Sequence, residues 1–144
     1  MDSSMNVLPI RLLPGQDLRR ALEAAVAECG CAAAFVLSGV GSLAPAILRL
    51  AGATELRENT GDTEILSLSG SIAVNGSHLH ATVSDAHGTV IGGHVAYGCV
   101  VRTTAEVLLA LLPDWRFSRE HDATTGYDEL VVRPASQPAT GDGV

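Results

Sequence analysis

Short apolar runs alternate with polar breaks along most of the chain, a pattern typical of β-strands joined by tight turns. Met5–Leu13 is an apolar run that ends at Pro14–Gly15, which predicts a first strand. Ala32–Val40 has Ser38 as its one polar residue, so we expect a strand that is covered on both faces.

Gln16–Cys29 is the segment with the clearest helical periodicity, and it predicts a helix over about residues 16–29. Asp17 places a carboxylate near the expected N-terminus, where the helix dipole favours negative charge. Gly30 suits the left-handed residue that ends many helices. Apolar side chains recur at spacings of three and four: Leu18, Ala21, Leu22, Ala25 and Val26.

Strand-length runs continue through the middle of the chain. Ala46–Leu50 and Thr54–Arg57 predict two short strands or one interrupted strand, followed by a polar turn over Glu58–Asp62. Glu64–Val74 predicts a longer strand, and Asn75–Gly76 is typical of a two-residue hairpin turn.

Residues 78–85 alternate with a period of two, so His78 and His80 should project from one face of a strand and their apolar neighbours from the other. The next four residues, Asp85–Gly88, contain the Asp and Gly of a hairpin connection. An apolar run then ends at His94. A hairpin here would bring His94 back towards His78 and His80.

Three neutral imidazoles from two strands suit zinc or a similar divalent ion and leave a position open for water or a ligand. The double glycine Gly92–Gly93 would let the backbone approach closely beside them. The alternative is that these histidines line a solvated strand face and bind nothing. His87 is interpreted as a residue of the turn.

The last third of the chain is less regular. Val95–Val101 and Thr103–Leu112 are apolar, and we predict strand there although the periodicity does not separate strand from helix. Charged residues between Arg116 and Asp122 predict a loop, and Tyr127–Arg133 predicts a last strand. Successive strands with hairpins and one helix favour an α+β fold with a mostly antiparallel sheet.

The length of 144 residues fits one domain, which we place at 1–133, followed by a disordered tail over 134–144 rich in Pro, Ser, Thr and Gly. Aromatic residues make up only 3%, so the core must consist of Ala, Val, Leu and Ile. The cysteines form no paired motif, and we expect small buried apolar residues at Cys29, Cys31 and Cys99.

The charge balance is acidic, with 9 Lys and Arg against 16 Asp and Glu, a net charge of −7. Such a balance makes direct nucleic-acid binding unfavourable, because that affinity comes largely from cations on phosphates. The first residues have no basic segment followed by an apolar core, and no run approaches the roughly 18 residues of a membrane span. We therefore expect a soluble cytoplasmic protein.

Several short motifs resemble the PPC (plant and prokaryote conserved) domain family, and the likeness covers about Val7–Arg133. The motifs keep the family's order: Leu12–Leu18, Leu37–Leu43, Glu64–Gly70, His78–His80, Asp85, Gly92–His94 and Thr125–Leu130. The resemblance implies a free-standing bacterial member, an α+β domain assembled as a homotrimer. In similar prokaryotic proteins a metal ion is held by histidines that correspond to His78, His80 and His94. Plant members carry an AT-hook before the domain, and this chain has no such segment.

Three functions follow from these observations. The first is a homotrimeric metal-binding protein that presents zinc or a similar divalent ion to a small ligand. The second is a DNA-binding or DNA-associated regulatory protein, as the family's label suggests, with a basic rim that could combine Arg102, Arg116, Arg119 and His121.

The third function is a metal-dependent hydrolase or lyase, because a three-histidine ion can lower the pKa of bound water to about 7. Such an enzyme needs a general acid or base nearby. Glu64 and Asp85 are candidates by their closeness in sequence, and Glu106 is a weaker one. The alternative for each is a salt-bridged or solvated carboxylate.

Overall fold

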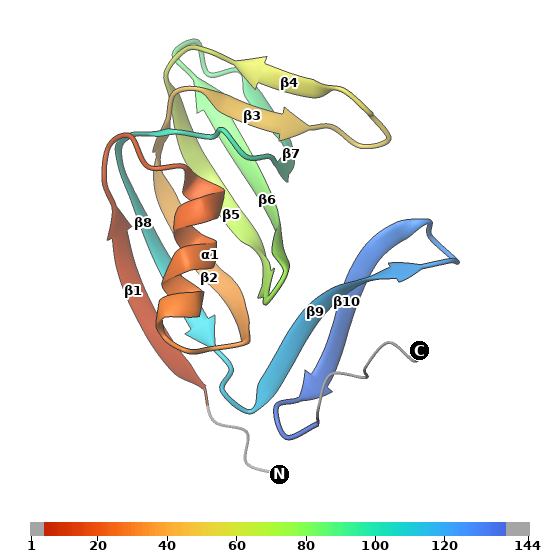
Figure 1. Cartoon of the computed structure of the whole chain (residues 1–144). Helices are drawn as coiled ribbons and strands as arrows, with labels where there is room; N and C mark the ends of the chain where they lie inside the picture. The colour runs from red at the N-terminus through yellow and green to blue at the C-terminus, as the bar shows by residue number, and fades with distance from the viewer. Residues whose placement is uncertain (1–4, 138–144) are drawn as a thin grey trace.

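The computed structural model describes residues 5–137, which form an antiparallel sheet of eight strands, one helix and a separate hairpin of two strands (Figure 1). The strand order of the sheet is β1-β8-β2-β5-β6-β7-β3-β4. The bounds are β1 (Asn6–Leu12), α1 (Leu18–Glu28), β2 (Ala33–Leu43), β3 (Ala46–Arg49), β4 (Leu56–Asn59), β5 (Thr63–Ala73), β6 (Gly76–Asp85), β7 (Val90–Val95), β8 (Val101–Leu111), β9 (Trp115–Asp122) and β10 (Tyr127–Pro134). The predicted α+β fold with a mostly antiparallel sheet is confirmed.

Helix α1 lies across one face of the sheet and covers the main hydrophobic core (Figure 1). Asp17 caps it, because its carboxylate accepts a hydrogen bond from the backbone N–H of Arg20 at 3.0 Å. Gly30 has a φ of +66°, the left-handed conformation that ends the helix. The helix turns three apolar side chains into the core: Leu18, Leu22 and Val26.

Between Phe35 and Val40, strand β2 is fully buried on one face only, which corrects the expectation that Ala32–Val40 is covered on both. Ala34 and Val36 lie in the core beneath α1. The opposite side of β2 and the adjoining part of β5 carry an exposed apolar face, which consists of Phe35, Leu37, Val40 and Leu66. Phe35 is 40% exposed and packs edge-to-face on Phe117 of the same chain, whereas the other three side chains are 49–53% exposed.

The predicted strands before the histidines are confirmed, with small shifts at their ends. Asn75 and Gly76 lie at the turn between β5 and β6, and β6 pairs with β5 on one side and β7 on the other. Glu58 and Asn59 belong to β4 rather than to the predicted turn. Of the apolar segment after His94, Thr103–Leu111 is strand, whereas residues 96–100 form a connection between β7 and β8.

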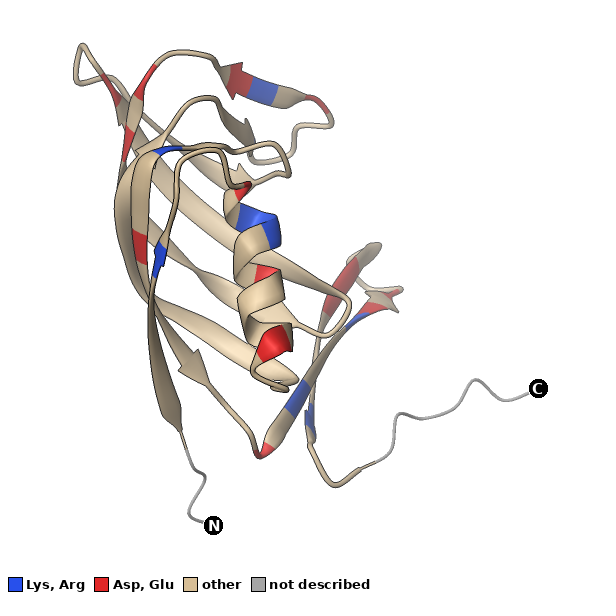
Figure 2. Ribbon diagram, turned by 60° about the vertical axis from the view of Figure 1, so that its left-hand side comes forward, with Lys and Arg blue, Asp and Glu red and all other residues tan. Residues whose placement is uncertain are grey.

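The charged loop predicted between Arg116 and Asp122 is wrong, because these residues form β9, which pairs with β10. This β9–β10 arm stands off from the sheet (Figure 1) and bears several charged residues (Figure 2). Ion pairs between β9 and β10 stabilise this polar strand. In one of them, the guanidinium of Arg133 lies 2.6 Å from the carboxylate of Glu120. Phe117 fixes the arm to the body in a second small core with Ala33 and Ala73.

The remaining expectations have mixed outcomes. Pro134 ends β10, which corrects its assignment to the predicted disordered tail, and 138–144 lie outside the described residues. Cys99 is buried and Cys31 partly so, whereas the expectation of burial is wrong for Cys29, which is exposed. Within the described part of the chain, no helix has the length and apolar character needed to cross a membrane.

Truncating Leu22 to Ala should lower the free energy of unfolding by about 2–5 kcal/mol, because its fully buried side chain would leave a cavity under α1. Urea denaturation followed by circular dichroism measures this change. Glu28→Ala, at an exposed position of the same helix, is the control and should change stability by less than about 0.5 kcal/mol. Equal stability of the two variants would contradict the packing described.

Candidate metal centre

His78 and His80 lie on the face of β6 that points away from α1. Their neighbours Leu79 and Ala81 point into the core, with exposed fractions of 0% and 3%. This alternation follows from the strand's period of two, and it confirms the predicted orientation of the histidine pair. Burial of the apolar side fixes the register of β6, since a slip by one residue would put the histidines in the core.

Strand β7 completes the group, because it returns antiparallel to β6 and places His94 directly opposite His80. The turn between these strands is held by Asp85, whose carboxylate accepts hydrogen bonds from the backbone N–H groups of His87 and Thr89, both at 2.9 Å. His87 is therefore a turn residue, as predicted. The local hairpin is sufficient to bring the three histidines together.

Gly93 allows the close approach between β7 and β3. A Cβ atom at this position would lie 2.7 Å from the carbonyl oxygen of Arg49. This is a steric clash, and only a shift of the backbone could relieve it. A Cβ atom at Gly92 would lie 3.4 Å from its nearest neighbour, which is an ordinary contact. Only Gly93, the second of the two glycines, is required for steric reasons.

The three imidazoles form a compact histidine cluster (His78, His80 and His94). Nε2 of His78 lies 3.0 Å from Nε2 of His80, and one nitrogen from each ring lies within 4.8 Å of the others. Nitrogens around a tetrahedral zinc ion stand about 3.3 Å apart, because each Zn–N bond measures about 2.0–2.1 Å. The cluster therefore fits such an ion after small side-chain rotations.

His94 carries a second sign of a ligand site. Its Nδ1 atom is buried and has no hydrogen-bond partner in the described part of the chain. Buried polar atoms in native proteins are nearly always paired, so an unpaired imidazole nitrogen beside two further imidazoles points to a missing partner. A metal ion, a water molecule or a polar ligand would supply it.

The electrostatics of the cluster keep its nitrogens available as ligands. Burial, followed by the charges of the nearby His78 and Arg19, lowers the pKa of His94 to about 4. Burial, followed by the charge of His80, also lowers the pKa of His78 below its usual value of 6.5. At neutral pH these two rings are uncharged, the state that binds a metal ion.

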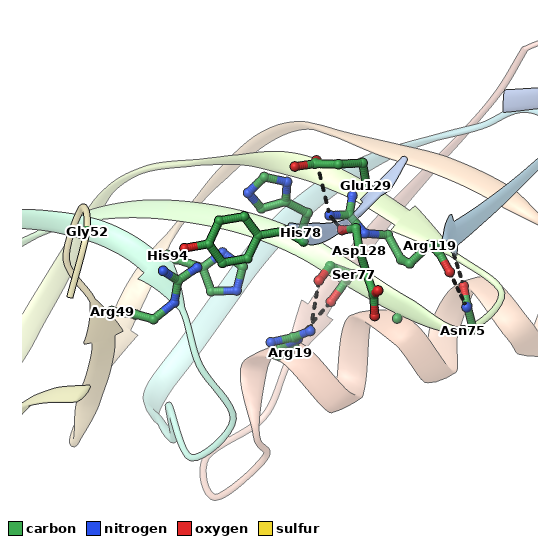
Figure 3. Close-up of a pocket in the computed structure, with 12 residues that line it drawn as sticks. Arg19, Arg49, Gly52, Asn75, Ser77, His78, His94, Arg119, Asp128 and Glu129 are labelled. Atoms are coloured by element: carbon green, nitrogen blue, oxygen red, sulfur yellow. Dashed lines mark hydrogen bonds and ion pairs between the residues drawn. The ribbon is translucent and has the colours of Figure 1, made fainter. Parts of the chain in front are cut away.

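A pocket of about 470 Å³ adjoins the cluster, and it is lined by residues from five regions of the fold (Figure 3). Besides His78 and His94 it includes cationic and anionic side chains that sequence reasoning did not place at the site: Arg19, Arg49, Arg119, Asp128 and Glu129. Arg49 lies directly opposite His94 in the β3–β7 ladder. That ladder joins distant segments, so no local pattern in the sequence reveals it.

Arg19 links helix α1 to both histidine strands. Its guanidinium donates to the carbonyl oxygen of Ser77 at 2.8 Å and to that of Val95 at 3.3 Å, each adjacent in sequence to a histidine of the cluster. It also donates to Glu23 at 3.2 Å. Arg19 thus holds the ends of β6 and β7 in place, and its hydrogen-bonding groups are largely used.

The structure does not bring the predicted acids and bases to the histidine cluster. Glu64 pairs with Ser84, and Asp85 ends β6 as the cap of its turn. Hydrogen bonds from the backbone of Thr89 and then His87 lower the pKa of Asp85. Glu106 lies in β8 opposite Val40.

The predicted basic rim is not assembled either. Arg102 pairs with Asp62 at 3.0 Å on another part of the molecule. His121 faces Asp128 across the arm, with 3.9 Å between their side chains. Among the four residues of the predicted rim, only Arg119 lines the pocket beside the histidines.

The model of one protein family, the Plants and Prokaryotes Conserved (PCC) domain, matches residues 1–113. The chain belongs to this family. It is the family that the sequence motifs indicate, and the matched part contains the whole histidine cluster. The match ends before the β9–β10 arm, which contributes Arg119, Asp128 and Glu129 to the pocket.

Known proteins support this assignment. A hypothetical protein from Salmonella cholerae-suis has the same fold with a TM-score of 0.88 and 40% identity, over 94% of this chain and 98% of that one. A metal-containing protein from Archaeoglobus fulgidus matches with a TM-score of 0.78 and 26% identity, over 90% of this chain and 95% of its own.

A curated relative of this chain is a much longer protein. The bifunctional protein GlmU of Synechococcus sp. (strain JA-2-3B'a(2-13)) is 49% identical over 92% of this chain, which corresponds to 21% of that protein. The chain thus spans between a fifth and a quarter of the length of the curated relatives it matches.

Replacing Gly93 with Ala should lower the free energy of unfolding by about 1–3 kcal/mol, because the added Cβ presses on the backbone of β3. Gly92→Ala is the matched control, one residue away in the same strand, and should change stability by less than about 1 kcal/mol. Urea titration of both variants measures the difference. Equal effects would contradict the close approach of β7 and β3.

Proposed function

We propose that this protein binds zinc or a similar divalent ion through His78, His80 and His94 and presents the ion to a small ligand. The observation that carries the proposal is the convergence of three imidazoles, one of which has a buried nitrogen without a partner. The description of the Archaeoglobus fulgidus relative as metal-containing supports it. The ion would act as a Lewis acid towards a bound oxygen or nitrogen atom.

The open side of the cluster gives a ligand access. His80 is exposed, and His78 and His94 line the adjoining pocket. Three protein ligands with a free position are typical of sites that bind water or substrate, whereas structural zinc sites use four protein ligands. The arrangement therefore favours an ion that meets a small molecule over an ion that only stabilises the fold.

We also propose that the protein forms a homotrimer, as its resemblance to the family implies, and that subunits pack through the exposed apolar face. Leu37 and Leu66 are 51% and 53% exposed, and both lie on the side of the sheet opposite α1. A contiguous apolar surface of this kind is unusual on a monomer and is typical of an interface. Phe35 of this face also shares a hollow with His78 and His80, which would put the metal site near a subunit boundary.

The other two functions have less support. A hydrolase or lyase needs an acid or base at the ion, and Glu64 and Asp85 lie elsewhere on the sheet. DNA binding is disfavoured by the net charge of −7 and by the dispersal of the predicted basic rim.

His80→Ala should lose most of the bound metal, because two imidazoles hold a divalent ion far more weakly than three. Elemental analysis of protein purified without an affinity tag measures the metal per chain. His87→Ala removes an exposed histidine of the adjacent turn and should retain the wild-type metal content. Wild-type protein without stoichiometric metal after reconstitution would refute the proposed site.

Leu37→Asp should shift the protein from trimer to monomer, since a charge in the centre of an apolar interface cannot be solvated there. Light scattering after gel filtration measures the mass. Leu13→Asp, at an equally exposed position in the turn before α1, should leave the trimer intact. A monomeric wild type, or a Leu37→Asp variant that remains trimeric, would contradict this interface.

A further inference from the structure

Three guanidinium groups line the pocket beside the histidine cluster, and they differ in what they already bind. Arg19 donates to Glu23 and to the backbone of β6 and β7, as described above. Arg119 donates to the carbonyl oxygen of Asp128 at 2.6 Å and approaches the carboxylate of Glu129 at 4.0 Å. Both side chains are therefore engaged in holding the walls of the pocket.

Arg49 differs from the other two, because its guanidinium makes no hydrogen bond or ion pair to any residue between 5 and 137. It is the last residue of β3 and lies opposite His94 in the ladder. Figure 3 shows its side chain directed into the pocket on the side of His94. Arg49 is a partly buried residue, so water reaches it less fully than an arginine on the open surface.

The acidic side chains of the pocket do not neutralise Arg49. Glu129 accepts a hydrogen bond from the hydroxyl of Thr125 at 3.0 Å and pairs with Arg119. Asp128 faces His121 across the arm. The wall that contains Arg49 and His94 therefore has a guanidinium charge without a partner among the described residues, and a divalent ion at the histidine cluster would add to this positive charge.

A guanidinium is a planar fork of N–H donors that fits the oxygens of a carboxylate or phosphate, usually through two parallel hydrogen bonds. The pocket volume of about 470 Å³ is in the range of small-molecule sites, which is about 300–1,000 Å³. A metal ion next to a free arginine is also an arrangement that fixes both the position and the orientation of an anion.

We infer that the ligand of this site is a small oxyanion, a carboxylate or a phosphate, and that Arg49 binds it beside the histidine cluster. This inference rests on the proposed metal site, because the ligand would contact both Arg49 and the ion held by the histidines. Arg49 is a binding residue here, since it contacts the anion directly and no histidine depends on it for its place in the sheet.

The test uses the untagged chain of 144 residues, loaded with cobalt, and measures the binding of inorganic phosphate and of acetate by calorimetry. Arg49→Gln should weaken the preferred anion at least about tenfold, the loss expected for one hydrogen bond between charged groups. Arg49→Lys should recover only part of this affinity, because a lysine lacks the fork. Arg57→Gln removes an exposed arginine from β4, the strand paired with β3, and should bind as the wild type does.

Cobalt content and thermal stability of each variant keep the result interpretable. Stronger binding of phosphate than of acetate assigns a phosphate ligand, and the reverse order assigns a carboxylate. Equal affinity of Arg49→Gln and wild type for both anions would overturn the inference, as would a cobalt-loaded wild type that binds neither.

The same titration without metal separates the two proposals. If the wild type takes up no cobalt but still binds phosphate or acetate in a manner that depends on Arg49, the metal site fails and the anion site stands. If cobalt binds stoichiometrically and substitution of Arg49 has no effect on either anion, the metal site stands and the anion site fails.

Discussion

The antiparallel pairing of β6 with β7 is the interaction on which the site depends. Its register places His94 opposite His80, and that register is held by the buried side chains on the other face of β6. The hydrophobic core thus sets the geometry of a polar site that it does not touch. Strand β6 has one apolar face and one face that bears histidines, so a shift of its register would expose core side chains to water.

Helix α1 adds a second constraint at the end of the same strands. Arg19 reaches from the helix to the carbonyl oxygens of Ser77 and Val95, so the packing of the helix also fixes the residues next to His78 and His94. The β9–β10 arm closes the pocket from the outside through Arg119. It is attached by reciprocal hydrogen bonds between Asn75 and the backbone of Arg119, at 2.9 and 2.7 Å.

The parts that the sequence predicts well are those whose structure is local. The histidine cluster lies on one hairpin, so the spacing of His78 and His80 and the turn before His94 were enough to predict it. The partners supplied by distant strands could not be found in this way, and Arg49 is the clearest case because β4, β5 and β6 lie between β3 and β7 in the sequence. The sequence pattern does not predict strand β9, because its charges are balanced by ion pairs to β10 that a run of polar residues does not reveal. An apolar run does not distinguish burial within a chain from an exposed apolar face, so the sequence predicts that both faces of β2 are covered.

The acidic body and the basic pocket act over different distances. Charges on the surface are screened within about 8 Å at physiological ionic strength, so the net charge of −7 repels a large polyanion that must contact much of the surface. A small anion inside the pocket interacts mainly with the nearest groups, which are Arg49 and any ion held by the histidines. Selection by size therefore follows from the charge distribution: nucleic acid is disfavoured by the whole surface, while a small carboxylate or phosphate experiences the local positive charge. A site of this kind does not need a basic protein around it, and an acidic exterior makes it more selective.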